Sequence, residues 1–271
     1  MPAKIIAGCN QKGGVGKTTT MQHLGRVAVH RGLRVLLVDG DPQGNLTTTT
    51  TAEELPQDTA GLADALSSRT SDTIRDVIVA GVWDGLDVVP TIGANDVLRA
   101  VRNELDAASV GRERRLSEAL APVLESYDLI LIDCGPSLDI LTINALTAAH
   151  AAIAITEPKL FGTHGLVQLL NTIREVGEYY NPSLYLAAVI VNRYQENTRS
   201  ARTWKADLDA NREALNLPIL EPPMPYHVAI SDAIEASKGL DEWPGAKARA
   251  AAKLYDNYLT TILSSLEGEQ S

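Results

Sequence analysis

The chain has 271 residues, enough for one large α/β domain, and an excess of 34 Asp+Glu over 24 Lys+Arg gives it a formal net charge of -10. This acidity argues against a uniformly basic nucleic-acid binder, so any contact with DNA must use a local patch. Only two cysteines occur, and neither a membrane span nor a signal-peptide pattern is present, so we expect a cytoplasmic protein without a disulfide framework or zinc site.

Short apolar runs alternate along the chain with longer segments of helical periodicity. The predicted strands are 4–10, 34–39, 86–90, 129–133, 151–156, 184–192 and 217–220. The predicted helices are 18–31, 95–108, 112–126, 163–180, 199–216 and 246–265. Because most of the strands are apolar without alternation, they are typical of parallel strands covered on both faces. The pattern predicts an α/β fold with a doubly wound, mostly parallel sheet, helices on both faces, and ligands beyond the carboxyl ends of the strands.

The remaining segments add no further module. The apolar runs are spread evenly, so we expect a single domain over 1–271. The segment before the first strand is too short for a helix-turn-helix domain, so we expect no sequence-specific operator binding by this chain. The threonine run 47–51 predicts a loop or a frayed helix start without function, because β-branched residues make a poor helix interior.

A glycine-rich loop joins the first predicted strand to the first predicted helix, with the sequence Gly13-Gly14-Val15-Gly16-Lys17-Thr18-Thr19. Such a loop lets successive backbone N–H groups face an anion at the start of a helix. Lys17 can reach the β and γ phosphates, and the Thr18 hydroxyl can ligate Mg²⁺. Gln11 stands where the strict Walker pattern has glycine, but the strand, loop and helix context is kept. The loop therefore predicts a P-loop NTPase that binds a nucleoside triphosphate.

A second lysine, Lys12, precedes the glycines. Its ammonium group cannot easily reach phosphates bound by its own loop, but it could reach across a subunit interface. A cation supplied in this way would stabilise charge that develops at the γ-phosphate. Lys12 therefore favours a dimer that closes over the nucleotide, with a solvated loop lysine as the alternative reading.

Two further strand ends carry carboxylates. Asp39 and Asp41 end the second predicted strand, and Asp133 ends the fourth in a Walker B-like pattern. Carboxylates at these ends face a nucleotide bound by the glycine loop. We expect Asp41, just before a proline, to orient the attacking water, and Asp39 and Asp133 to contact Mg²⁺ through water. An Asp-Pro turn with a capping aspartate is the alternative for Asp41.

Three motifs together resemble the deviant Walker ATPases of the ParA/MinD family, with the greatest similarity to ParA-type partition proteins. They lie at 12–19, 39–45 and 132–137, and further similarity at 156–158, 191–193 and 225–233 extends the resemblance over nearly the whole chain. In that family the first lysine reaches across an ATP sandwich dimer, the second binds phosphate, and the aspartate before Pro-Gln positions the hydrolytic water. The resemblance implies these catalytic roles for Lys12, Lys17 and Asp41, with ATP and Mg²⁺ as cofactors.

The resemblance also implies an adenine site formed by Asn192, Met224 and Pro225. An amide at a strand end offers a donor and an acceptor to the base edge, and a proline-rich loop supplies an apolar wall. A turn role is the alternative for Asn192. One departure concerns Gly135, which stands where the family commonly has proline after the Walker B Asp-Cys. Because glycine is more flexible than proline, we expect the switch loop after Asp133 to be less rigid than in the family.

A second departure concerns DNA binding. Arginines that DNA-binding members carry near the equivalents of Tyr226 and Ala229 are absent, so other cations are needed. The candidates are Arg193, Arg199, Arg202, Lys205, Lys247, Arg249 and Lys253. For the cations at 193–205 and for those at 247–253, the alternative is that they lie on solvated helix faces.

The function implied by the resemblance is a partition ATPase that hydrolyses ATP to ADP and phosphate, weakly when alone. ATP would close a homodimer that binds DNA nonspecifically on the nucleoid, and a ParB-like partner would stimulate hydrolysis and release it. A MinD-like positioning ATPase with a protein or membrane cargo is an alternative, although the acidic end of the chain disfavours membrane binding. This chain lacks the loop cysteines that an iron-sulfur enzyme needs. A small-molecule synthetase is a further alternative.

Overall fold

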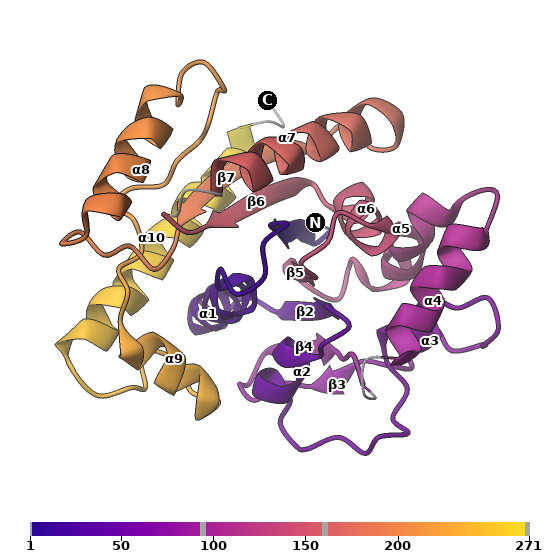
Figure 1. Ribbon diagram of the computed structural model, residues 1–271. Coiled ribbons are helices and arrows are strands. Elements are labelled where there is room, and N and C mark those ends of the chain that lie inside the picture. Colours follow the sequence, from indigo (N-terminus) through magenta and orange to yellow (C-terminus); the bar gives the residue numbers. More distant parts are fainter. Residues whose placement is uncertain (1, 93–95, 159–161, 269–271) are drawn as a thin grey trace.

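The computed structural model describes residues 2–92, 96–158 and 162–268, and its centre is a seven-stranded sheet (Figure 1). The order is β3-β4-β2-β5-β1-β6-β7, and only β3 runs antiparallel to its neighbour. This confirms the predicted doubly wound, mostly parallel sheet. The strands are β1 (Lys4–Cys9), β2 (Val35–Gly40), β3 (Val79–Ala80), β4 (Leu86–Val89), β5 (Leu129–Cys134), β6 (Ala151–Thr156) and β7 (Tyr185–Val191).

Helices cover both faces of this sheet, as Figure 1 shows. They are α1 (Lys17–His30), α2 (Asn45–Thr50), α3 (Leu62–Leu66), α4 (Asp96–Ala107), α5 (Arg115–Leu120), α6 (Ile140–Ala148), α7 (Gly162–Tyr179), α8 (Arg199–Ala210), α9 (Val228–Glu235) and α10 (Ala246–Gly268), with short 3₁₀ turns at Arg112–Arg114 and Ala121–Val123. None of the described helices has the length and apolar character needed to cross a bilayer.

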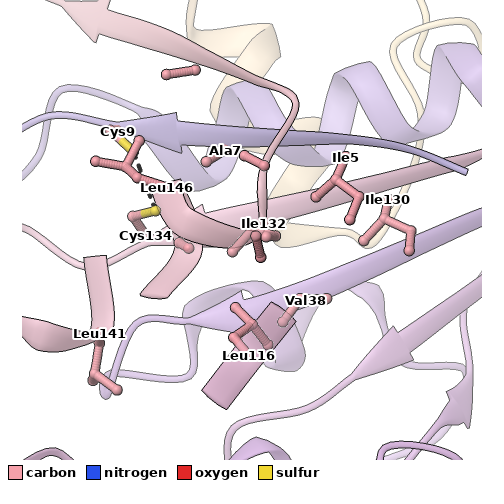
Figure 2. Packing of buried hydrophobic residues seen from close by; sticks show 14 of the residues in the cluster. Ile5, Ala7, Cys9, Val38, Leu116, Ile130, Ile132, Cys134, Leu141 and Leu146 are labelled. Atoms are coloured by element: carbon pink, nitrogen blue, oxygen red, sulfur yellow. Dashed lines mark hydrogen bonds between the residues drawn. The ribbon is translucent and has the colours of Figure 1, made fainter. Parts of the chain in front are cut away.

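Side chains that alternate along each strand divide the interior into two cores. Ile5, Ala7 and Cys9 join the core under α3 to α7, whereas Ile6 joins the core under α1, α9 and α10. Figure 2 shows the first core, in which the thiols of Cys9 and Cys134 lie 3.3 Å apart. Both cysteines are free and buried, so they act as packing residues of this core. Burial on both faces explains why the strands are continuously apolar.

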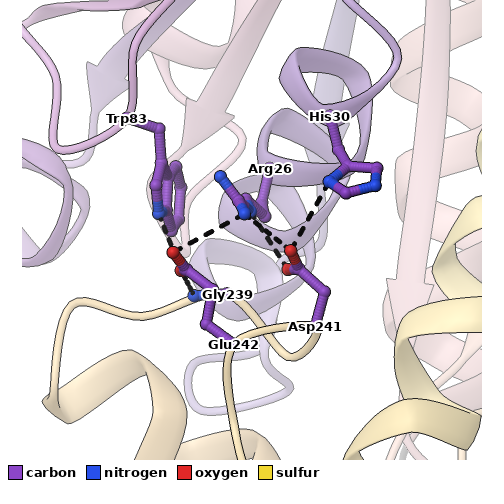
Figure 3. A network of polar contacts seen from close by, with 6 residues as sticks. All are labelled: Arg26, His30, Trp83, Gly239, Asp241 and Glu242. Atoms are coloured by element: carbon purple, nitrogen blue, oxygen red, sulfur yellow. Dashed lines mark hydrogen bonds and ion pairs between the residues drawn. The ribbon is translucent and has the colours of Figure 1, made fainter.

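A polar network fastens the segment between α9 and α10 to the outer part of α1 (Figure 3). Arg26 of α1 forms an ion pair with Asp241 at 2.6 Å and lies 5.2 Å from the ring centroid of Trp83. Glu242 accepts hydrogen bonds from the Trp83 indole at 3.0 Å and from the Gly239 amide at 2.6 Å. Arg26 thus contacts both a carboxylate and an aromatic ring. These contacts join α1, the segment that carries Trp83 and the segment between α9 and α10 at one residue.

Four predicted elements need correction. The predicted strand 217–220 forms only a single bridge, between Ile219 and Val189, because Pro218 has no N–H for a sheet. The predicted helix 112–126 is broken into α5 and two 3₁₀ turns, the second of which contains Pro122. The predicted helix 199–216 ends at Ala210, and the threonine run forms α2.

Helix α2 survives its threonines because their hydroxyls bond back along the helix. The Thr48 and Thr50 hydroxyls donate to the carbonyls of Gly44 and Leu46, at 3.0 and 2.6 Å. Leu46 is fully buried in the second core. Tertiary packing and these local bonds together outweigh the low helix propensity of threonine.

Candidate functional site

The glycine loop lies between β1 and α1, as the sequence predicts. Gly14 and Gly16 have φ angles of 76° and 87°, a left-handed conformation that favours glycine. Gly16 has a second reason to be glycine, because a Cβ there would collide with the Asn192 amide. The loop opens onto a cavity of about 610 Å³ lined by Gly13, Gly14, Gly16, Lys17, Thr18, Thr19, Asp41, Gln43, Asn45, Thr48, Thr49, Pro136, Arg193, Ile234 and Glu235.

The two loop lysines are placed differently. Lys17 is almost fully buried, and its ammonium group donates to the Lys12 carbonyl at 3.4 Å. The Lys12 amide donates to the Asn10 side chain at 2.9 Å, and the Asn10 amide in turn donates to the Ile155 carbonyl of β6 at 2.5 Å. Lys17 lines the cavity, whereas Lys12 is not among the residues that line it. Of the two lysines, Lys17 is therefore the one that borders the cavity.

Asp133 is placed to receive a cation beside the loop. Its Oδ2 accepts the Thr18 hydroxyl at 2.6 Å, and its Oδ1 is buried without a hydrogen-bond partner among the described residues. A buried acceptor without a donor is costly unless a ligand satisfies it. Hard divalent cations prefer hydroxyl and carboxylate oxygens. Thr18 and Asp133 therefore fit Mg²⁺.

Burial controls the protonation of the two acidic strand ends. Asp39 and Asp133 occupy paired positions on β2 and β5, and both have no exposed surface. Burial raises the pKa of Asp39 to about 7. Burial and the nearby charge of Asp39 raise the pKa of Asp133 to about 8, against the opposing effects of Thr18 and Lys17. Asp133 of this pair contacts Thr18 of the cavity wall, so the pair would gain from a cation bound there.

Asp39 is held by protein donors at both oxygens. Its Oδ2 accepts the Thr47 amide at 2.8 Å and the Thr47 hydroxyl at 2.7 Å, and its Oδ1 accepts the Asp41 amide at 3.3 Å. The Thr47 hydroxyl also accepts the Thr91 amide at 2.9 Å. The threonine run therefore supports Asp39 through Thr47, a contact between residues eight positions apart on different elements.

Asp41 lines the cavity and is almost fully buried. Its Oδ1 accepts the Gln43 amide at 3.0 Å, which is the turn contact expected from Asp-Pro. Gly135 lies beside it, and a Cβ at that position would stand 3.5 Å from Pro42, an ordinary contact. The structure therefore gives Asp41 both a turn role and a position facing the cavity, and gives Gly135 room for a side chain.

The predicted base site is built unevenly. Asn192 and Pro225 line a narrow cleft of about 10 Å³ next to the loop, together with Tyr226. The Met224 side chain is fully buried in the second core. Its backbone pairs with the strand end instead, since its amide donates to the Val191 carbonyl at 2.8 Å. Met224 is thus placed to shape the loop through its backbone.

The seven candidate DNA-binding cations fall into different surroundings. Arg193 points toward the glycine loop, where it donates to the Gly14 carbonyl at 2.6 Å. Lys205 forms ion pairs with Asp209 at 2.7 Å and Glu221 at 2.6 Å. The described structure brings two others together, because Arg202 of α8 and Lys253 of α10 line one cavity of about 1250 Å³. Arg199 begins α8, and Lys247 and Arg249 lie in the first turn of α10.

Comparison with known proteins places this loop and sheet in a family. Residues 3–186 match a family model described as an AAA domain. The sporulation initiation inhibitor protein Soj of Bacillus subtilis is 43% identical over 195 residues, 72% of this chain and 74% of that protein. The chromosome partitioning protein ParA of Caulobacter vibrioides is 36% identical over 234 residues, 86% of this chain and 84% of that protein. The chain belongs to the ParA/Soj family of partition ATPases.

Other comparisons set the extent of this similarity. An uncharacterized Mycobacterium tuberculosis protein is 41% identical over 201 residues, which are 74% of this chain but only 61% of that protein. The crystal structure of cobyrinic acid a,c-diamide synthase from Mycobacterium smegmatis, with a bound ATP analog and magnesium, has a TM-score of 0.78 and 30% identity over 96% of this chain and 94% of that chain. This member of the ParA/Soj family therefore shares its fold with a protein that holds an ATP analog and magnesium.

Proposed function

We propose that the chain is a nucleotide-switched partition ATPase, a single domain over 1–271 that binds DNA nonspecifically in its ATP state. The observation that carries the proposal is the combination of the glycine loop with the Thr18 and Asp133 contact, where one carboxylate oxygen of Asp133 is buried without a hydrogen-bond partner among the described residues. Membership in the ParA/Soj family supports the partition role.

In the proposed reaction, ATP and water give ADP and phosphate. Lys17 holds the phosphate oxygens of its own loop, and Lys12 reaches the nucleotide of a second copy in a homodimer. Asp41 orients the attacking water from its place in the cavity wall. Thr18 and Asp133 would hold Mg²⁺, with Asp39 beside Asp133. The bound ion would neutralise charge on the phosphate oxygens.

The DNA surface that we propose centres on the cavity between α8 and α10. Arg202 and Lys253 come from separate helices and converge there, which gives a local basic site on an acidic protein. A dimer would double this site. A ParB-like partner would accelerate hydrolysis and release the DNA, and cytoplasmic, nucleoid-associated location would follow from the DNA-bound state.

DNA co-sedimentation in ATP and in ADP tests this proposal. Wild-type protein should sediment with DNA in ATP and not in ADP. Lys17→Ala should lose the ATP-dependent binding, whereas Asp41→Ala should retain it because it holds ATP without hydrolysing it. Equal DNA binding in every state would refute the switch.

A second candidate is a small-molecule synthetase, favoured by the 30% identity to a synthase over nearly the whole chain. Its activity would release phosphate only when a small-molecule substrate is added. If phosphate release by the purified protein is stimulated by DNA and the partner protein, and not by a small-molecule substrate, the synthetase function is excluded.

A further inference from the structure

We propose that Arg193 and Asn192 are positioning residues that hold the glycine loop in its phosphate-binding shape. The two residues follow β7 directly and lie far from the loop in sequence. The inference rests on the proposed nucleotide binding and assigns to Arg193 a role other than contact with DNA.

The first observation is that two consecutive residues hold two consecutive loop carbonyls. The Arg193 guanidinium donates to the Gly14 carbonyl at 2.6 Å, and the Asn192 amide donates to the Val15 carbonyl at 2.9 Å. A trans peptide points its C=O and its N–H in opposite directions. Fixing these two carbonyls on one side therefore turns the amides of Val15 and Gly16 to the other side, as an anion nest requires.

The second observation is that Arg193 and Asn192 are themselves held. Arg193 has a φ angle of 53°, a left-handed conformation that is unfavourable for a residue with a side chain. Its guanidinium also contacts the buried Glu157 at 3.2 Å, and its amide donates to the Asn192 Oδ1 at 2.9 Å. The backbone N–H of Asn192 donates to the Thr156 carbonyl at 2.7 Å. Arg193 and Asn192, which we call the clamp, are thus anchored to the ends of β6 and β7.

The third observation concerns the neighbouring base loop. The Tyr194 amide donates to the Met224 carbonyl at 2.9 Å, and the Tyr226 amide donates to the Tyr194 carbonyl at 3.0 Å. Arg193 lines both the phosphate cavity and the narrow cleft beside Pro225. The same turn that holds the phosphate loop therefore also carries the wall of the base cleft, which ties the two halves of the nucleotide site together.

Calorimetric titration with MgATP and with inorganic tripolyphosphate, which has no base, tests the proposal. Arg193→Ala should weaken the binding of both by about tenfold, because a charge-assisted hydrogen bond to the loop is lost. Arg193→Lys should lie between Arg193→Ala and wild type, since one ammonium can replace part of the contact. Arg174→Ala removes an exposed arginine of α7 and should leave both affinities and the unfolding temperature unchanged.

Hydrogen exchange gives an independent reading without ligand. The amides of Val15 and Gly16 should exchange faster in Arg193→Ala than in wild type, at an unchanged unfolding temperature. Unchanged tripolyphosphate affinity in Arg193→Ala, or a loss confined to ATP or to DNA, would overturn the clamp. Failure of wild-type protein to bind MgATP would instead refute the proposed function, and the clamp with it.

Discussion

Asp39 and Asp133 lie side by side at paired positions of β2 and β5, each fully buried and each with its pKa raised by that burial. Their placement brings two buried carboxyl groups together next to the phosphate loop. A protein that keeps such a pair without a bound cation loses stability, because the charged forms are poorly solvated. The pair therefore weakens the fold when no cation is bound.

The first prediction is that nucleotide-free protein becomes less stable as pH rises from about 4 to about 8. In the unfolded chain both groups ionise near 3.8, whereas in the folded chain they hold protons up to about 7 and about 8. The folded state then binds more protons in this window, so the free energy of unfolding falls with rising pH and levels off above it. Urea unfolding at pH 5, 6.5 and 8 measures this slope.

Two variants separate the cause of the slope. Asp133→Asn should flatten it and make the protein more stable than wild type at pH 8, while abolishing hydrolysis. Asp128→Asn should leave the slope unchanged, because the Arg34 contact lowers the pKa of Asp128 to about 2, outside this window. A wild-type stability that rises from pH 5 to pH 8 would contradict the assignment.

The second prediction separates the two loop lysines. Lys17→Ala should lose nucleotide binding, because Lys17 is the buried cation of the cavity. Lys12→Ala should still bind nucleotide but should hydrolyse it about 10²- to 10³-fold more slowly, if its charge acts in a second copy. Light scattering with a nonhydrolysable ATP analogue should show dimers for the control Lys238→Ala and monomers for Lys12→Ala. Wild-type turnover by Lys12→Ala would remove the proposed role in trans.

The third prediction concerns Thr47. Thr47→Val removes the hydroxyl that connects Asp39 to the Thr91 amide, so the free energy of unfolding should fall by about 1 to 3 kcal/mol. Thr47→Ser keeps the hydroxyl and should retain most of the stability. Chemical denaturation of both variants at one pH gives the comparison, and equal stabilities would show that the hydroxyl contributes nothing.

The fourth prediction compares a shielded ion pair with an exposed one. Arg26→Ala leaves Asp241 and Glu242 without their cation and exposes Trp83, so it should lower the unfolding free energy by about 1 to 3 kcal/mol. Arg34→Ala breaks an exposed, solvent-screened pair with Asp128 and should lower the unfolding free energy by less than Arg26→Ala does. Thermal unfolding orders the two variants, and a reversed order would contradict the proposed importance of the network.

The sheet and the phosphate loop could be predicted from sequence because their signals are local. Consecutive glycines, a lysine and a threonine between a strand and a helix define the loop without knowledge of distant residues. The carboxylates at 39 and 133 could be placed because parallel strands bring their carboxyl ends to one edge. Helix α6 was missed because it is apolar on nearly all sides, so it shows no periodicity.

The remaining site residues depend on long-range contacts. The bond between Arg193 and Gly14 joins residues on separate elements, and nothing in the run Asn192-Arg193-Tyr194 indicates it. Thr47 acts through Asp39, and Met224 is buried although the adjacent Pro225 lines the narrow cleft beside the loop. Charge alone grouped Arg193 and Lys205 with the exposed cations, whereas the fold gives both of them nearby partners.

The Arg26 network ties the segment after α9 to α1, while the Tyr226 amide just before α9 donates to the Tyr194 carbonyl. Asp241 and Glu242 follow the carboxyl end of α9 and are tied to α1, while Val228 at its amino end is 60% exposed. Ile234 and Glu235, near the tied end, form part of the cavity wall. A fluorescent dye attached to a cysteine at position 228 would sit at an exposed position of a helix that borders the cavity, so it would make an optical reporter of nucleotide entry.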